Sequence, residues 1–190
     1  MKSAVWGVFR RASIKAVLWA LTTSTALLWL AACGAAPETS GAAQADSRAP
    51  TEATFYLVRH AEKELEGRDP ELSAAGYERA KALAARLGPV ELSAVYSTDT
   101  RRTRDTAAVV LAQKNMTLQI YDGRGLEDFA ETLFDARGNI LIVGHSNTTP
   151  QLAEALGGEG GSPIVEATEY DRLYILRRRN DAVETELQRY

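Results

Sequence analysis

Two short segments carry the residues of this chain that could do chemistry. They are LVRHAEK at residues 57–63 and LIVGHSN at residues 141–147. Each places a histidine, His60 or His145, directly after an apolar run that is typical of a buried strand, and the chain has only these two histidines. Because ligands bind at the carboxyl ends of strands in open α/β sheets, we expect both imidazoles at one edge. Together with Arg59, they indicate phosphate chemistry on a histidine nucleophile.

The segments around these motifs alternate between strand and helix patterns. The strand patterns lie at residues 54–58, 94–96, 118–121, 140–143, 173–178 and 183–188. The helix patterns lie at residues 72–87, 103–113, 126–134 and about 149–156. Ser73 is a plausible N-cap of the first helix. This alternation predicts a mostly parallel sheet covered by helices on both faces, and the last two strands add an antiparallel edge.

The amino-terminal part of the chain has the pattern of a secretory signal, predicted at residues 1–32. Four basic residues come first, and residues 16–32 are then apolar apart from hydroxyl side chains. A membrane-spanning helix is the weaker interpretation, because it needs about 20 strongly apolar residues. The ending Leu-Ala-Ala-Cys resembles the bacterial lipobox, which implies cleavage before Cys33 and a lipid on its sulfur. The alternative is an ordinary signal peptide with a chance cysteine.

Residues 33–53 are predicted to be a flexible tether. From residue 34 onward this segment holds no leucine, isoleucine, valine or aromatic residue, so it cannot bury an apolar core. A lipid on Cys33 followed by such a tether predicts a protein anchored in a bacterial cell envelope, at the outer membrane or the periplasmic face.

Residues 54–190 are long enough for one domain with a single core. Loss of the four basic residues of the signal leaves 18 of the 22 basic residues against 25 acidic ones, a net charge near −7. That balance argues against nucleic acid as a partner. One basic cluster, at residues 177–179, is expected to be a solvated strand end.

Four motifs follow one another along this domain. They are LVRHAEK, DPELSAAGYERAKALAARL, AVYSTDTRRTRDTA and LIVGHSNTTPQLAEALGG, at residues 57–63, 69–87, 94–107 and 141–158. In this order they resemble the motifs of the histidine phosphatase superfamily, the phosphoglycerate-mutase-like fold. The resemblance implies a three-layer α/β/α sandwich and an enzyme of the small phosphatase branch that acts on a small phosphorylated substrate. It implies no cofactor.

The chemistry assigns roles to the first motif. A phosphate monoester carries nearly two negative charges, so its attacker must stand among cations that neutralise the oxygens. His60 can attack through one ring nitrogen while the other donates to a backbone carbonyl. Arg59 offers a planar fork for two phosphate oxygens. By resemblance, His145 completes the phosphate pocket opposite His60 as a charged donor.

A second phosphate arginine comes from the third motif. The family pattern places it four residues before a Thr-Ala pair, which selects Arg102. Arg101 and Arg104 are then expected to be solvated. Asp99 departs from the family pattern at this point. It could disfavour highly anionic substrates, contact a hydroxyl or amine, or act as a helix N-cap, which is the commoner role.

The proton donor to the leaving oxygen remains open among three carboxyls. Glu127 occupies the position after the third strand where the family often carries its acid, and Asp128 and Glu62 are rivals. A plain carboxylate at a helix start is almost as good an interpretation. No metal is required, since the arginines supply the positive charge and the sequence has no cluster of metal ligands.

Three other functions have to be weighed. A phosphoglycerate-mutase-type phosphotransferase shares the nucleophile, but such enzymes carry inserted segments, and only 42 residues separate Arg102 from His145. A protein phosphohistidine phosphatase fits the size, yet its substrates are cytosolic. A non-catalytic phospho-ligand-binding lipoprotein would be expected to lose its nucleophile, whereas this chain keeps His60.

Overall fold

The computed structural model describes residues 52–190. The predicted signal, Cys33 and all but the last two residues of the predicted tether lie outside the described residues. The strands are β1 Glu52–Arg59, β2 Leu92–Ser97, β3 Gln119–Ile120, β4 Gly138–Gly144, β5 Arg172–Arg179 and β6 Ala182–Arg189. The helices are α1 Ala74–Arg86, α2 Arg101–Lys114, α3 Leu126–Thr132 and α4 Thr148–Ala155.

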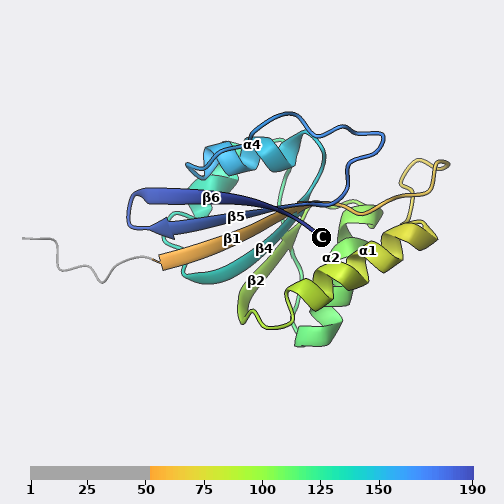
Figure 1. Ribbon diagram of the computed structural model, residues 1–190, viewed down its shortest axis with the longest axis horizontal. Coiled ribbons are helices and arrows are strands. Elements are labelled where there is room, and N and C mark those ends of the chain that lie inside the picture. Colours follow the sequence, from red (N-terminus) through yellow and green to blue (C-terminus); the bar gives the residue numbers. More distant parts are fainter. Residues whose placement is uncertain (1–51) are drawn as a thin grey trace, which may run out of the picture. The chain divides into compact units, whose positions relative to one another are not determined.

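The strands form one sheet in the order β3-β2-β4-β1-β5-β6 (Figure 1). The pairs β2 with β3, β2 with β4 and β1 with β4 are parallel, whereas β5 is antiparallel to both β1 and β6. The predicted α/β class is therefore confirmed, as is the antiparallel edge formed by the last two strands.

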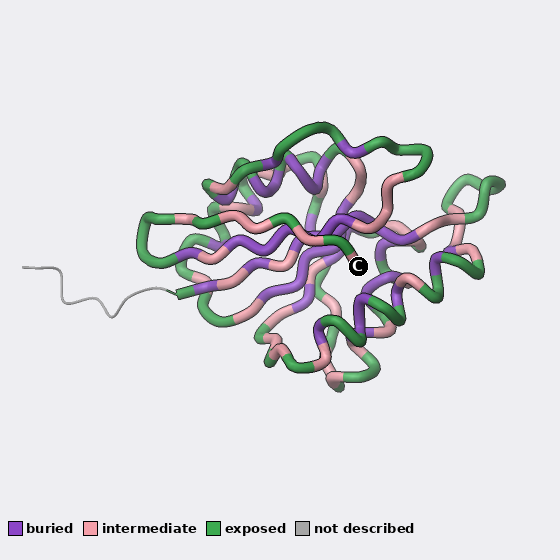
Figure 2. The backbone as a smooth tube through the Cα atoms, viewed as in Figure 1, coloured by how far each residue is buried: buried purple, intermediate pink, exposed green. Residues whose placement is uncertain are grey.

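Helices cover both faces of the sheet, with α1 and α2 on one side and α3 and α4 on the other (Figure 1). The side chains of the central strands alternate between the two faces. Phe55 and Leu57 of β1 enter the core beneath α3 and α4, while Val58 enters the core beneath α1 and α2. Figure 2 shows this burial running along the middle of the sheet. Among residues 52–190, no helix is long and apolar enough to cross a membrane.

The start of α1 agrees with the sequence, since the Ser73 side chain accepts the backbone N–H of Gly76 at 3.2 Å. The start of α2 does not. Thr100 is its N-cap, and the carboxylate of Asp69 accepts the backbone N–H of Arg101 at 3.0 Å. The predicted N-cap role of Asp99 is therefore wrong, because a carboxylate from a distant loop supplies the acceptor.

The third strand is shorter than predicted because its register with β2 covers only two residues. Tyr121, expected as its last residue, is buried and donates its backbone N–H to Ser97 at 3.0 Å. Gly138 begins β4 with a φ of 81°, a conformation that glycine adopts easily.

The basic cluster at the end of β5 is only partly solvated. Arg177 pairs with Glu186 at 2.8 Å on the hairpin surface. Arg178 points to the opposite face, where it is buried and donates through Nη2 to the carbonyls of Leu133 and Ala136 at 3.0 and 2.9 Å. The expectation of a solvated strand end is therefore wrong for Arg178, because alternate residues of a strand face opposite sides.

Candidate active site

The two histidines meet at the carboxyl edge of neighbouring parallel strands. Arg59 at the end of β1 pairs in register with Gly144 at the end of β4, so His60 and His145 leave the sheet side by side. The backbone N–H of His60 donates to the carbonyl of Gly144 at 2.9 Å. The ring centroids of the two histidines lie 5.5 Å apart. The structure thus brings together the two motifs from which the phosphate chemistry was inferred.

The ring of His60 is held in the form that a nucleophile needs. Its Nδ1 lies 2.7 Å from the carbonyl oxygen of Ala61. A carbonyl can only accept, so Nδ1 carries the proton and Nε2 keeps its lone pair. Burial, together with the charges of Arg59 and Arg102, lowers the pKa of His60 to about 3. The imidazole is therefore neutral at neutral pH.

Arg59 is buried, with 1% of its surface exposed. Its Nη1 donates to the backbone carbonyls of Glu166 at 2.8 Å and Glu169 at 3.0 Å, and its Cζ lies 4.0 Å from the centre of the Tyr170 ring. Burial lowers the pKa of Arg59. Its Nε is also buried, and no acceptor for it lies among residues 52–190.

Arg102 and His145 form the other half of the pocket. Nη2 of Arg102 lies 3.4 Å from Nδ1 of His145, and because a guanidinium only donates, Nδ1 is the acceptor. Nε2 of His145 then donates to Oγ1 of Thr98 at 2.9 Å. Burial and the charge of Arg102 lower the pKa of His145 to about 4. The ring is neutral here, so the predicted charged donor would require the negative charge of a bound anion.

The remaining contacts of Arg102 are weak. Its Nη1 lies 3.6 Å from Asp69, and its buried Nε has no partner in the described part of the chain. Arg101 and Arg104 are exposed instead, in ion pairs with Glu71 and Asp99. Among the three arginines of the third motif, only Arg102 contacts His145, as the spacing argument selected.

Gly144 is required where β4 turns toward the site. A Cβ atom at this position would lie 2.9 Å from the hydroxyl oxygen of Tyr121 and 3.0 Å from Oγ1 of Thr148. That Thr148 oxygen also accepts the backbone N–H of His145 at 3.0 Å. The absence of a side chain at Gly144 therefore lets a hydroxyl from the start of α4 approach closely and fix the backbone of His145.

The candidate proton donors lie apart from the histidines. Glu62 forms an ion pair with Arg79, which donates to its carboxylate through Nη2 at 2.6 Å and Nε at 2.9 Å. Burial would raise the pKa of Glu62, but these hydrogen bonds outweigh it and lower the pKa. A carboxyl held ionised in this way cannot readily supply a proton, so Glu62 is a poor general acid.

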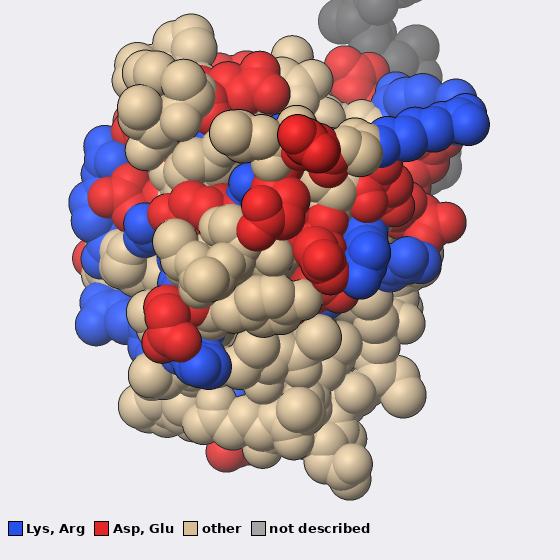
Figure 3. All heavy atoms as spheres, turned by 90° about the vertical axis from the view of Figure 1, so that its right-hand side faces the viewer, with Lys and Arg blue, Asp and Glu red and all other residues tan. Residues whose placement is uncertain are grey.

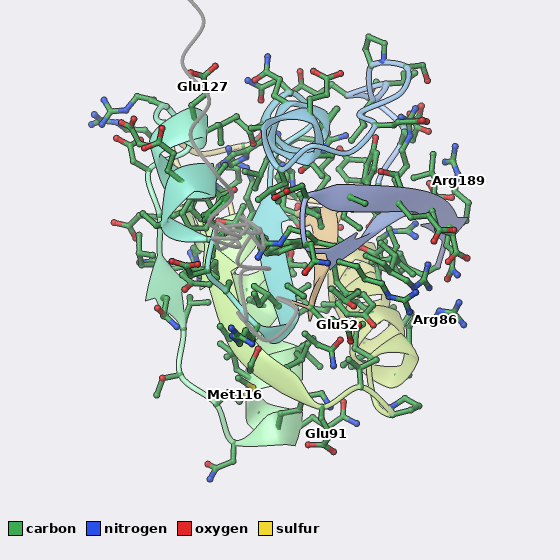
Figure 4. The ribbon with its side chains drawn as sticks, turned by 90° about the vertical axis from the view of Figure 1, so that its left-hand side faces the viewer. Glu52, Arg86, Glu91, Met116, Glu127 and Arg189 are labelled. Atoms are coloured by element: carbon green, nitrogen blue, oxygen red, sulfur yellow. The ribbon has the colours of Figure 1, made fainter. Side chains whose placement is uncertain are left out.

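Glu127 and Asp128 are exposed in the first turn of α3. Figure 4 shows Glu127 on the outer side of α3. Both carboxyls line an open hollow together with Asn147 and Thr148. Asn147 and Thr148 also line a second hollow, which contains His145. The structure therefore places Glu127 beside the site rather than in contact with the two histidines.

The rim of the pocket is acidic, although its floor is basic. Acidic side chains gather on the surface toward which β1 runs (Figure 3). Glu64, Glu66, Asp69 and Glu71 line a hollow beside Arg101, so acidic side chains predominate there. Asp99 and Asp122 line the hollow that contains His145, but they are paired with Arg104 and Arg124. A phosphate group is attracted to the floor, whereas further negative charge on a substrate would be repelled where it approached the carboxylates of the first hollow.

Comparison with known proteins agrees with this geometry. A family model, the histidine phosphatase superfamily (branch 1), matches residues 55–135. The matched residues end before β4, so they include His60 but not His145. In the fold, His145 lies beside His60 at the end of β4. Over residues 55–135 the chain is therefore similar to the histidine phosphatase superfamily. Comparison with curated proteins gave no significant match.

Solved structures of histidine phosphatases share this fold at low sequence identity. An Escherichia coli protein described as an alpha-ribazole-5'-P phosphatase has a TM-score of 0.60 and 16% identity, over 73% of this chain and 96% of its own. The Agrobacterium tumefaciens protein described as the phosphohistidine phosphatase SixA has a TM-score of 0.57 and 20% identity, over 72% of this chain and 98% of its own. Mycobacterial glucosyl-3-phosphoglycerate phosphatase has a TM-score of 0.55 and 14% identity, over 73% and 98%. The predicted enzyme class, a phosphatase-type hydrolase, is supported.

One part of this site was missed by sequence reasoning. The segment between α4 and β5 supplies Tyr170 and the two carbonyls that hold Arg59. Because β5 is antiparallel to β1, the residues that precede β5 must lie at the edge where β1 ends. The hairpin pattern at the carboxyl end of the chain was the signal in the sequence that could have placed this segment beside Arg59. Among residues 52–190, no group of three or more His, Cys, Asp or Glu side chains is placed to hold a metal ion.

Proposed function

We propose that this protein is a phosphatase that hydrolyses phosphomonoesters through a phosphohistidine on His60, without a metal ion. The observation that carries the proposal is the pair of buried Nε–H donors on Arg59 and Arg102, which have no acceptor within residues 52–190 and flank a neutral nucleophile. A buried donor left without a partner costs about 1–3 kcal/mol. Phosphate oxygens are the acceptors that two guanidinium groups beside an imidazole fit best.

The geometry supports a two-step reaction. In the first step, Nε2 of His60 attacks phosphorus in line, the bond from phosphorus to the ester oxygen breaks, and that oxygen takes a proton from a carboxylic acid. The hydrogen bond from Nδ1 to Ala61 stabilises the charge that develops on the ring. In the second step, water attacks phosphorus and gives a proton to the carboxylate, and the bond between phosphorus and Nε2 breaks. Arg59 and Arg102 neutralise the oxygens throughout.

The leaving group is expected to lie over the hollow beside His145. That hollow is lined by polar groups from the ends of β2 and β3 and from the start of α4. Glu127 remains the proposed proton donor, with Asp128 as its rival, since both line the adjoining hollow. The acidic rim favours phosphomonoesters that carry no further negative charge. The sugar phosphates of a bacterial envelope are candidate substrates, and its lipopolysaccharide phosphates, which carry further negative charge, fit this preference less well.

The proposed location is the bacterial cell envelope, with a lipid on Cys33 as the anchor and residues 33–53 as the tether. The support is the order of basic, apolar and small residues that ends in Leu-Ala-Ala-Cys. Two or more lipid chains are needed for stable anchoring. Mass spectrometry of the membrane fraction should show a lipidated peptide that begins at Cys33. A soluble mature protein with an unmodified cysteine would refute this part of the proposal.

Rapid quench with a radiolabelled phosphomonoester tests the mechanism. We expect a phosphoenzyme that is labile in acid and stable in alkali, and a turnover rate that EDTA leaves unchanged. The variant His60→Ala should lose both the label and turnover. If it keeps either at the wild-type level, the nucleophile is assigned wrongly. If the wild-type protein binds phosphate but never forms the phosphoenzyme, a non-catalytic binder is the better description.

A further inference from the structure

The segment at residues 162–171, between α4 and β5, forms a wall of the site that the mechanism above does not use. It contacts Arg59 in two ways. The backbone carbonyls of Glu166 and Glu169 accept from Nη1 at 2.8 and 3.0 Å, and the ring of Tyr170 lies over the guanidinium with its centre 4.0 Å from Cζ. One corner and one face of the guanidinium are therefore occupied by this segment.

The same ring faces the nucleophile. The centroid of the Tyr170 ring lies 6.0 Å from that of His60, and the two ring planes are inclined by 56°. Tyr170 is only partly exposed. A group bound at His60 would thus have the guanidinium of Arg59 on one side. The ring of Tyr170 would lie behind that guanidinium.

A buried ion pair fixes this segment from the other side. Glu169 accepts from Nε and Nη2 of Arg172 at 2.7 and 2.8 Å and from the backbone N–H of Val165 at 3.0 Å, with 12% and 6% of the two side chains exposed. Nη1 of Arg172 donates to the carbonyl of Ser162 at 2.6 Å and to the hydroxyl of Tyr174 at 3.1 Å. The bidentate pair closes the segment on itself and joins it to β5, so Tyr170 is held in place from both ends.

A phosphate site gains from such support. A free arginine side chain has many rotamers, and ordering it at the moment of binding weakens the binding. Catalytic groups must be held close to the productive geometry by contacts of their own. The carbonyls fix one corner of Arg59 and the ring fixes its plane, so the remaining N–H groups have a set direction before phosphate arrives.

We propose that Tyr170 is a positioning residue of the phosphate site, whose ring, held by the Glu169–Arg172 ion pair, fixes the guanidinium of Arg59 for phosphate. This inference rests on the proposed function only in taking Arg59 as a phosphate ligand. The hydroxyl of Tyr170 also interacts with Arg59, but the inference assigns the positioning role to the ring, which lies over the guanidinium.

Binding of inorganic phosphate to the full chain, measured by isothermal titration calorimetry, tests the inference without any need for turnover. We expect Tyr170→Leu to raise the dissociation constant about 10-fold, on the scale of a partly lost charge-assisted hydrogen bond. Tyr170→Phe keeps the ring and should recover most of that loss. Tyr77→Leu removes an exposed tyrosine from α1 and is the matched control, with no expected change. Circular dichroism melting identifies any variant that has failed to fold.

A double-mutant cycle separates positioning from a general structural role. If Tyr170 acts through Arg59, the change Tyr170→Leu should have little further effect on phosphate binding in an Arg59→Ala background. Additive losses would overturn the inference, as would equal losses in the Leu and Phe variants or no loss in either. Suppose that the wild-type protein binds phosphate and that Tyr170→Leu weakens this binding 10-fold, but that no phosphoenzyme ever forms. That result would refute the proposed function and leave this inference standing.

Discussion

The phosphate end of the site and its leaving-group side are built in different ways. At the phosphate end, His60 and Arg59 are almost fully buried, and each is held by backbone carbonyls. On the leaving-group side, Glu127 and Asp128 are exposed in the first turn of a seven-residue helix beside two open hollows. Backbone carbonyls and buried rings cannot rearrange easily, whereas exposed carboxylates can.

The difference teaches where selectivity should be found. In the proposed mechanism, recognition of the phosphate is set before the substrate arrives, so any change there should affect every substrate. Recognition of the leaving group depends on solvated side chains, so changes there should depend on the substrate. Four measurements can test this contrast between the two sides of the site.

At the phosphate end, Arg102→Ala should lower kcat/KM for every phosphomonoester by about 10²- to 10³-fold, the usual effect of losing one oxyanion donor. Arg104 lies on the same helix, but it is exposed and pairs with Asp99, so Arg104→Ala serves as the control and should stay within about twofold, since exposed ion pairs contribute little. Steady-state kinetics on an alkyl and an aryl phosphate would measure both variants. Equal losses in the two variants would mean that the spacing argument chose the wrong arginine.

On the leaving-group side, Glu127→Gln should slow hydrolysis of a sugar phosphate by about 10²-fold, because a general acid contributes at least that much when the leaving oxygen is basic. Hydrolysis of p-nitrophenyl phosphate should change far less, because nitrophenolate leaves without a proton. Glu131→Gln, another exposed carboxylate on α3, is the control. A similar loss on both substrates would point to phosphate binding or folding, and no loss on either would pass the role to Asp128.

The buried histidines should make the fold sensitive to mild acid. Burial is the main cause that lowers their pKa values to about 3 for His60 and about 4 for His145. A histidine in the unfolded chain titrates near pH 6.5, so below that pH the unfolded chain binds protons that the folded chain does not, and stability falls.

Between pH 7 and pH 5 we expect the free energy of unfolding to fall by about 1–2 kcal/mol for each histidine. Urea denaturation at several pH values measures this fall. The variant His145→Asn should lose about half of the pH dependence, and a variant that kept all of it would show that the ring of His145 is accessible to protons in the folded protein.

The acidic rim should give the smallest effect. Salt screens exposed charges, so raising the ionic strength from 0.05 to 0.5 M should raise kcat/KM for a sugar bisphosphate relative to a sugar monophosphate by about two- to fivefold. Glu66→Gln should weaken this dependence on salt. Glu91, at the opposite edge of the sheet before β2, is the matched control (Figure 4). If salt changes kcat/KM by the same factor for both substrates, the rim does not select among substrates.

The sequence was sufficient to predict the fold class, and it proposed four residues that the structure brings to one edge of the sheet. Apolar runs that alternate with amphipathic segments predict a parallel sheet, and parallel strands must bring the residues that follow them to one edge. His60 and His145 could therefore be placed together from their positions after two such runs. Arg102 was selected by the resemblance, because the family pattern places its arginine four residues before a Thr-Ala pair.

Only the tertiary structure decided which polar groups remain available for chemistry. Glu62 and Glu127 were both candidate proton donors in the sequence, but Arg79 on α1 forms an ion pair with Glu62. Asp69 replaces Asp99 at the start of α2. The contact of Arg59 with Glu166 spans 107 residues of chain. Such pairings depend on which loops the sheet order brings together, and no local pattern of residues specifies that order.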